Sequence, residues 1–431
     1  TVTPARAAAL EARGDMRRGF RLDLTFGRVA SRLEPRDRAF AHQLLYGSTR
    51  LQGRLDHLLE RRVKGGLDRL DAPVLEALRL GAYELLYMDG VPDYAARSQA
   101  VELAAGAAGR GAGGLVNAVL RRVREDGDDP ALFPDPASDP AGSLTTFGSH
   151  PRWLVERWLE RWSVQGVERL LDADNRVPDL TLVPLDRALE EAVAAFEASG
   201  IEAEPVTGTG CLRLPAGTDP VAALEVLPSV IQDPGANLVV SYADLPPGTE
   251  VADLCAAPGG KALALARRAA YTVAADRSDL RMRMVQDNVT RTGRRLGMVV
   301  ADAALPPFRA LDAVLLDVPC SGTGTLRRHP DGRWRLTPAD IPELAAVQQR
   351  LLAAAAPLVR PGGHLVYSTC TLEPEENEDQ IDAFLDEHPG FAVESTGAVP
   401  EACRDPRGFL RVLPQETGFD GAFAARLRRA A

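Results

Sequence analysis

The chain has 431 residues, too many for one average domain, which predicts two or three domains. Its 45% hydrophobic and 26% charged residues are typical of a soluble globular protein, and no apolar stretch is long enough to span a bilayer. A formal net charge of −10 argues, taken over the whole chain, against a polyanionic partner.

The charge is unevenly distributed, however. Residues 1–124 hold 21 Arg and Lys and 14 Asp and Glu, whereas residues 125–431 hold 29 and 46. The basic front third is compatible with a nucleic-acid surface or with an ordinary solvated helical surface. Five cysteines without CxxC spacing and six scattered histidines indicate neither a disulfide framework nor a metal site. We therefore expect free thiols, no metal and a cytoplasmic location.

The front third is predicted to be helical. Apolar residues recur at helical spacing in four blocks within residues 5–124, with Gly and Pro mainly between them: 39–58, 74–88, 95–105 and 115–123. The Pro-, Asp- and Gly-rich stretch that follows is typical of a linker. A smaller mixed region then begins near residue 150. We predict an all-α domain over 1–127, a linker over 128–149 and a small α/β domain over 150–232.

From residue 233 to 431 strands alternate with helices, which predicts a doubly wound α/β domain with a parallel sheet. The expected strands are 251–254, 272–275, 298–301, 313–316 and 365–368. The expected helices are 261–269, 280–292, 341–358 and 375–385. The carboxyl ends of such strands are where open sheets bind ligands, so residues there are candidates for a site.

A glycine turn follows the first of these strands, Cys255-Ala256-Ala257-Pro258-Gly259-Gly260-Lys261. Backbone amides at a helix start favour an anion, but the turn is neither GxGxxG nor a P-loop. Asp276 suits a carboxylate that binds ribose hydroxyls, and Asp302 could accept from an adenine amino group. Acids after successive strands predict an adenosine-bearing cofactor such as S-adenosylmethionine, although single aspartates also cap helices.

Two cysteines end the last two of these strands. Cys320 lies in Asp317-Val318-Pro319-Cys320, which is similar to the D-P-P-Tyr turn of amino-group methyltransferases but has a thiol in place of the aromatic residue. Cys370 follows Tyr367-Ser368-Thr369. A thiolate that adds to C6 of cytosine makes C5 nucleophilic, and a carboxyl group such as Asp317 would assist at N3 and the exocyclic amine. Carbon methylation of cytosine is therefore predicted.

The blocks DLCAAPGGK, DVPCSGTG with RRHPDGRW, and YSTCTLEPEENE resemble those of the RNA cytosine-C5 methyltransferases of the Nop2/Sun/RsmB family. The front blocks LRLGAYELLYM and LVNAVLRR resemble the NusB-like RNA-binding domain. The resemblance implies an all-α NusB-like domain, a small α/β middle domain and a Rossmann-like methyltransferase domain. It also implies 16S ribosomal RNA as partner, and we expect a monomer without membrane or metal.

The family pattern makes Cys370 the nucleophile and Cys320 the thiol that assists release of the product. It makes the turn Cys255–Lys261, with Asp276, Asp302 and Asp317, the cofactor and active-site positions. Cys255 is interpreted as structural within the turn. RNA contacts, by phosphate pairing and base stacking, are predicted for Arg327, Arg328, Arg333 and Trp334, whose other interpretation is an ordinary solvated loop.

Three alternatives stay open at this point. The two thiols could have reversed roles, because DNA cytosine-C5 methyltransferases use the cysteine of a Pro-Cys pair, which here is Cys320. The protein could be an RNA adaptor with a vestigial catalytic half, which the intact Lys261 and both cysteines disfavour. A small-molecule methyltransferase would leave the basic helical domain unexplained.

Overall fold

The computed structural model describes residues 1–431, which form two compact units. The first unit comprises Thr1–Arg176 together with Leu326–Leu336, and the second comprises Val177–Thr325 and Thr337–Ala431. The sequence of the second unit is thus interrupted by eleven residues that fold with the first.

The first unit is helical, as predicted. Its helices are α1 (Pro4–Arg17), α2 (Leu22–Ala30), α3 (Pro35–Arg50), α4 (Gln52–Glu60), α5 (Ala72–Tyr87), α6 (Asp93–Ala108), α7 (Arg110–Asp126), α8 (Pro140–Thr146), α9 (Arg152–Leu159), α10 (Val164–Asn175) and α16 (Gly332–Arg335). Helix α5 is buried along most of its length, and α1, α3, α6 and α7 pack around it to form the core. The alanine-rich face of α1 permits this close approach.

Two details of this unit differ from the sequence-based prediction. The stretch predicted as a linker is folded: it contains α8, and Phe133 and Leu144 are buried. Helices α9 and α10, which we grouped with the small α/β region, belong to the helical unit. The Pro- and Asp-rich composition of this stretch predicted a linker, but its few apolar side chains are buried and hold it in the fold.

The second unit contains two sheets. The smaller has the order β2-β3-β1-β4, with all neighbours antiparallel. Its elements are β1 (Leu180–Pro184), α11 (Leu189–Ala198), β2 (Glu204–Val206), β3 (Cys211–Leu214), α12 (Pro220–Val226) and β4 (Ser229–Ile231). This order of strands and helices is the ferredoxin-like, split βαβ arrangement.

The larger sheet has the order β10-β12-β9-β8-β5-β6-β7, and β11 pairs with β12. Its strands are β5 (Glu250–Asp253), β6 (Tyr271–Asp276), β7 (Gly297–Val300), β8 (Leu311–Asp317), β9 (Val359–Thr369), β10 (Phe391–Val393), β11 (Leu410–Val412) and β12 (Ala422–Arg429). The strands β5 to β9 are parallel, as predicted, whereas β12 runs antiparallel to β9 and makes the sheet mixed.

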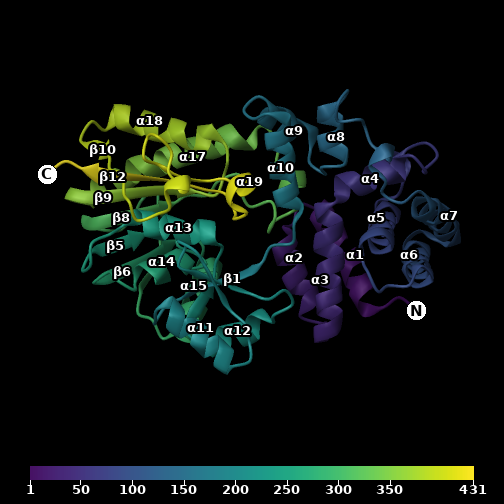
Figure 1. Ribbon diagram of the computed structural model, residues 1–431, viewed down its shortest axis with the longest axis horizontal. Helices are drawn as coiled ribbons and strands as arrows, with labels where there is room; N and C mark the ends of the chain where they lie inside the picture. The colour runs from purple at the N-terminus through teal and green to yellow at the C-terminus, as the bar shows by residue number, and fades with distance from the viewer. The chain divides into compact units, whose positions relative to one another are not determined.

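Helices cover both faces of the larger sheet (Figure 1). The helices of the second unit outside the small sheet region are α13 (Pro234–Ala243), α14 (Gly260–Leu265), α15 (Asp279–Thr292), α17 (Asp340–Ala355), α18 (Glu378–Glu387) and α19 (Pro414–Thr417). One core contains residues of α17 and α18, and a second contains residues of α13 and α14. Local sequence fixes the helix ends: Ser278 caps α15 by accepting from Arg281 N, and Gly293 ends it in the left-handed conformation.

Candidate functional site

The glycine turn joins β5 to α14 at the carboxyl edge of the sheet. Gly259 has φ +103°, and a Cβ there would lie 3.2 Å from Cγ1 of Val285, so only glycine fits without strain. The turn is held against the next strand, because Ala256 N donates to Ala275 O at 2.9 Å. Gly260 then starts α14 with free backbone amides, which suit an anionic group.

Three carboxylates follow the adjacent strands β5, β6 and β7 at this edge. Asp253 is 1% exposed, and its Oδ1 accepts from Cys255 N at 3.3 Å while its Oδ2 has no partner. Burial raises the pKa of Asp253 to about 7. Oδ1 of Asp276 accepts from Ser278 N at 3.0 Å, and Oδ1 of Asp302 from Ala304 N at 2.9 Å. Each of these two carboxylates therefore caps a turn through one oxygen. The second oxygen of Asp276 lies 3.5 Å from Arg281 Nη1 and keeps capacity to accept a further hydrogen bond.

A further polar residue lies at the turn, and the sequence analysis missed it. Gln232 follows β4 of the small sheet and is 9% exposed, and its Oε1 is buried without a hydrogen-bond partner. A Cβ on Gly260 would lie 3.4 Å from that Oε1. Buried polar atoms are rarely left unpaired. The absence of partners at Gln232 Oε1 and Asp253 Oδ2 therefore indicates that a ligand with hydrogen-bond donors binds at the glycine turn.

The two cysteines meet. Cys320 Sγ lies 3.2 Å from Cys370 Sγ, and Cys370 N donates to Cys320 Sγ at 3.3 Å. Their strands β8 and β9 are parallel neighbours with Asp317 opposite Ser368, which brings residues 50 positions apart together. The hydrogen bond with Cys370 and burial raise the pKa of the Cys320 thiol well above its usual value. A raised pKa favours the protonated form of the Cys320 thiol.

A lysine–carboxylate pair adjoins the thiols. Lys261 Nζ donates to Asp317 Oδ2 at 2.7 Å, and Ser368 Oγ donates to Asp317 Oδ1 at 2.7 Å. Burial alone would lower the pKa of Lys261, but the charge of Asp317 outweighs it and the pKa is raised. The ammonium therefore remains charged and holds Asp317 in one orientation.

A buried glutamate supports the loop that carries Cys320. Glu376 Oε1 accepts from Ser321 N and from Gln348 Nε2, each at 2.9 Å, and Tyr367 donates to the Glu376 carbonyl at 2.6 Å. Burial raises the pKa of Glu376. Its block YSTCTLEPEENE was recognised from the sequence, but this positioning role was not, because the partners come from three separate segments.

The segment predicted to contact RNA folds into the helical unit. Arg333 is fully buried, and its guanidinium donates to five protein acceptors: Asn175 Oδ1 at 2.7 Å, and the carbonyls of Ser149 at 3.1 Å and of Arg50, Asp174 and Leu326 at 3.2 Å. A guanidinium enclosed in this way has no face for a phosphate, so the RNA contact predicted for Arg333 is corrected to a structural role.

Trp334 is also engaged within the protein, because its indole N–H donates to Thr49 O at 2.7 Å. The carbonyls of Thr49 and Arg50 are the last of α3, and the block of helical spacing over 39–58 forms two helices that are separated at Leu51. Side chains of the 326–336 segment satisfy these carbonyls in place of a next helical turn. Arg327 and Arg328 are half-buried, and their RNA contacts stay a prediction.

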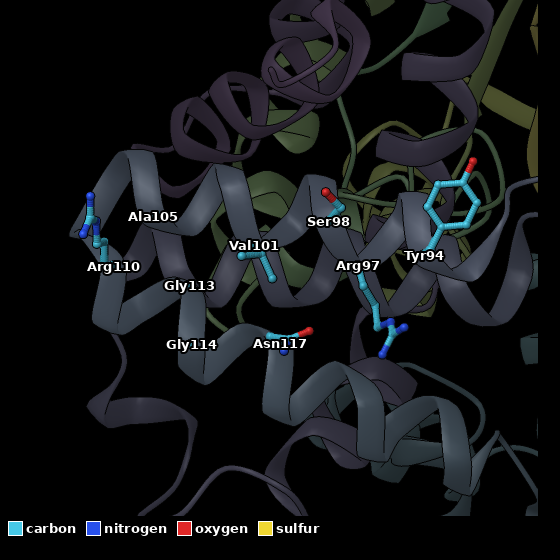
Figure 2. A pocket seen from close by; sticks show the side chains of 9 residues that line it. All are labelled: Tyr94, Arg97, Ser98, Val101, Ala105, Arg110, Gly113, Gly114 and Asn117. Carbon is cyan, nitrogen blue, oxygen red and sulfur yellow. The ribbon is translucent and has the colours of Figure 1, made fainter.

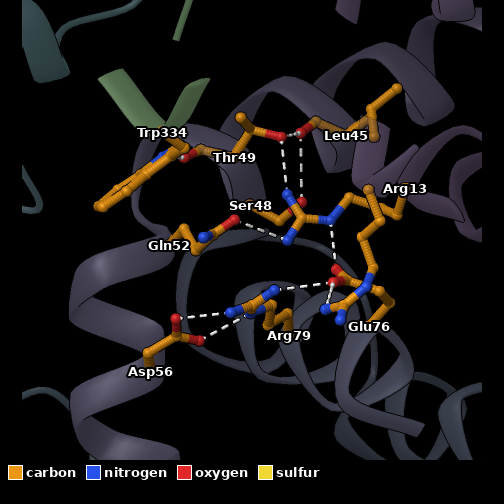
Figure 3. Close-up of polar contacts among 10 residues, drawn as sticks. Arg13, Leu45, Ser48, Thr49, Gln52, Asp56, Glu76, Arg79 and Trp334 are labelled. Carbon is orange, nitrogen blue, oxygen red and sulfur yellow. Dashed lines mark hydrogen bonds and ion pairs between the residues drawn. The ribbon is translucent and has the colours of Figure 1, made fainter. Parts of the chain in front are cut away.

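Beside Trp334, a chain of ion pairs joins α1, α4 and α5 of the same unit, and a hydrogen bond links it to α3 (Figure 3). Arg13 of α1 pairs with Glu76 of α5 at 2.5 Å and donates to Thr49 Oγ1 at 3.0 Å. Arg79 of α5 bridges Glu76 and Asp56 of α4, at 2.7 Å each. Because the charges alternate and are largely buried, they fix the geometry of the helices against which Trp334 packs.

A groove of about 490 Å³ runs between α6 and α7 of the helical unit (Figure 2). Tyr94, Arg97 and Arg110 supply an exposed aromatic ring and two cations, and Asn117 supplies an amide. Gly113 lets the helices approach, since a Cβ there would lie 3.1 Å from Cβ of Ala105. Arg97 lies near Tyr94, whereas Arg110 lies at the other end of the groove (Figure 2). An aromatic ring and cations along one groove are groups that bind single-stranded nucleic acid.

Two classes of feature are absent from the chain. No helix combines the length and apolarity that crossing a bilayer would need. No group of three or more His, Cys, Asp or Glu side chains is placed to hold a metal ion.

Three family models match the chain in order: the NusB family over residues 4–125, the ferredoxin-like domain of RsmF/B-like methyltransferases over 150–219, and the 16S rRNA methyltransferase RsmB/F over 242–428. The fold class predicted from the sequence is thereby confirmed.

Individual relatives agree. The chain is 34% identical to the probable ribosomal RNA small subunit methyltransferase B of Synechocystis, with 92% of each chain covered. It is 32% identical to the corresponding protein of Bacillus subtilis, with 93% of this chain and 92% of that protein covered. A solved methyltransferase homologue from Pyrococcus horikoshii covers 68% of this chain and 99% of its own, at TM-score 0.56 and 24% identity, and shares the fold.

Proposed function

Because the chain belongs to the family of ribosomal RNA small subunit methyltransferases B, we propose that it methylates C5 of a cytosine in 16S ribosomal RNA with S-adenosylmethionine. The observation that carries the cytosine-C5 assignment is the pair Cys320–Cys370, whose sulfurs are 3.2 Å apart beside Asp317 and Lys261. Nitrogen methylation needs no thiol, whereas addition to C6 needs one.

The turn and its surroundings fit S-adenosylmethionine. The start of α14 suits its carboxylate, and the unpaired acceptors of Asp253 and Gln232 suit its ammonium. Asp276 and Asp302 suit the ribose hydroxyls and the adenine amino group. When bound, the cofactor supplies the methyl group as an electrophile.

The protein's own residues then act on the base. The Cys370 thiolate forms a bond to C6, and N3 takes up a proton from solvent, which it returns when that bond breaks. Asp317, oriented by Lys261, accepts from the exocyclic amine and so favours this addition. C5 takes the methyl group, and its hydrogen leaves as a proton to solvent. The bond from Cys370 to C6 then breaks, and the protonated Cys320 donates to the departing thiolate. The ring regains its original state, so no oxidant or reductant is needed.

Trapping with RNA that contains 5-azacytidine tests the two thiol roles. We expect Cys370→Ala to abolish both methylation and the covalent adduct, and Cys320→Ala to retain or accumulate the adduct. Loss of the adduct in Cys320→Ala with retention in Cys370→Ala would reverse the assignment. Calorimetry with S-adenosylmethionine separates either case from an adaptor protein, which would not bind the cofactor.

The helical unit is proposed to bind the RNA. Its net basic charge and the cations and aromatic ring of the α6–α7 groove supply phosphate pairing and base stacking. The target base must leave its stack for C6 to reach Cys370. Arg327 and Arg328 stay candidates for RNA contacts within the same unit.

A further inference from the structure

A cluster of five arginines lies in the second unit, at the end of the larger sheet opposite the cofactor turn. Arg267 and Arg268 follow α14 and precede β6, Arg294 and Arg295 follow α15 and precede β7, and Arg187 follows β1 of the small sheet. Since β5, β6 and β7 are parallel, the segments that enter them share one edge, and it is not the edge that bears Asp253 and Cys320.

Arg267 lies near Arg187, Arg268 and Arg294, and Arg295 follows Arg294 directly in the chain. Arg267 Nη2 is 3.5 Å from the carbonyl of Arg187, and Arg187 pairs with Asp186 at 2.8 Å. Burial and the nearby charges of Arg294 and Arg268 lower the pKa of Arg267, and Asp186 is the acid that opposes them. The cluster therefore contains more positive charge than its own acid neutralises.

Three members present free guanidinium groups. Arg268 and Arg295 are exposed, Arg294 is half-buried, and none of the three forms an ion pair. Residues 261–300 hold nine Arg and Lys against three Asp, in a part of the chain where residues 125–431 hold 29 basic and 46 acidic residues. A cation at a helix C-terminus is stabilised by the macrodipole, but this does not account for several cations placed against each other.

We propose that this arginine cluster binds the phosphate backbone of the substrate RNA at nucleotides flanking the target cytosine; the proposal rests on the proposed function. Guanidinium groups pair with phosphates in a bidentate fashion and give affinity without reading sequence. Helix α15 has 14 residues, so its two ends are about 21 Å apart. That length corresponds to roughly six stacked nucleotides at about 3.4 Å each.

The test compares two triple variants of the full chain. Arg268→Gln/Arg294→Gln/Arg295→Gln removes the free guanidinium groups of the cluster. The control, Arg309→Gln/Arg350→Gln/Arg411→Gln, removes the same charge from three exposed arginines on other segments that form no ion pair. The dissociation constant for a 16S rRNA transcript is measured by filter binding across a salt series, and methylation at saturating RNA gives kcat.

For the cluster variant we expect binding weaker by about tenfold or more near 0.1 M salt, and a log–log salt slope smaller by about 2–3, since each lost phosphate contact removes about 0.7–0.9. Its kcat should match the wild type, and the control should bind within about twofold. Equal dissociation constants and slopes for cluster variant and wild type would overturn the proposal, as would an equal loss in the control. A wild type that binds the transcript but methylates no RNA would instead refute the proposed function.

Discussion

Replacing Arg333 by Met should destabilise the helical unit severely. The side chain is fully buried and satisfies five acceptors, four of them main-chain carbonyls that cannot turn away to find water. Asp174 is 1% exposed, and burial raises the pKa of its carboxyl to about 7, a rise that the positive charge of Arg333 opposes. Removing one partner from such a buried arrangement costs about 3–5 kcal/mol, a large part of a typical 5–15 kcal/mol stability.

The assay can isolate this unit. All four tryptophans of the chain, Trp153, Trp158, Trp162 and Trp334, belong to the helical unit, so urea unfolding followed by tryptophan fluorescence reports on it alone. Arg335→Met is the matched control on the same short helix, because Arg335 is 37% exposed and pairs only with Asp331. Because the buried Asp331 loses this partner but keeps Leu22 N as a donor, that variant should cost about 1–3 kcal/mol, less than Arg333→Met. A loss below about 1 kcal/mol in Arg333→Met would refute the structural role and return Arg333 to the RNA surface.

Three further outcomes are expected. Lys261→Met should lower the yield of the 5-azacytidine adduct at least about tenfold, because Asp317 loses the donor that orients it; a full yield would remove Lys261 from the mechanism. Asp253→Asn should flatten the pH dependence of the unfolding free energy. Because the folded pKa of Asp253 is about 7, well above its unfolded value, this residue makes the wild type less stable as pH rises from about 4 to 7. Urea midpoints of both proteins across that pH range measure the difference. Arg97→Gln with Arg110→Gln should weaken binding of the rRNA transcript several-fold with kcat unchanged, and unaltered filter binding would exclude the α6–α7 groove.

The sequence predicted those parts of the site that depend on strand order. Asp276 ends β6 and Asp302 follows the parallel neighbour β7, and the convergence of Cys320 with Cys370 follows from the same rule. It could not predict Gln232, whose place at the turn depends on how the small sheet packs on α14. Such packing leaves no local pattern in the chain.

The error at Arg333 has a related cause. An arginine in a polar, glycine-containing segment is usually on the surface, and here the acceptors that bury it are mostly main-chain carbonyls, which every residue type possesses. The ends of α3 and α10 supply several of them, so the segment caps helices far away in sequence.

The asymmetry of the two thiols needed both kinds of information. The spacing and order of the strands predict that Cys320 and Cys370 lie at the same edge of the larger sheet, but they do not distinguish the roles of the two thiols. In the structure Cys320 lies in a loop that Glu376 and Gln348 hold in place, and the contact with Cys370 and burial raise the pKa of its thiol. A raised pKa favours the protonated thiol, which suits a group that donates to a leaving thiolate. This chemistry agrees with the proposed roles, and the assignment of Cys370 as nucleophile still depends on the family pattern and on the trapping experiment.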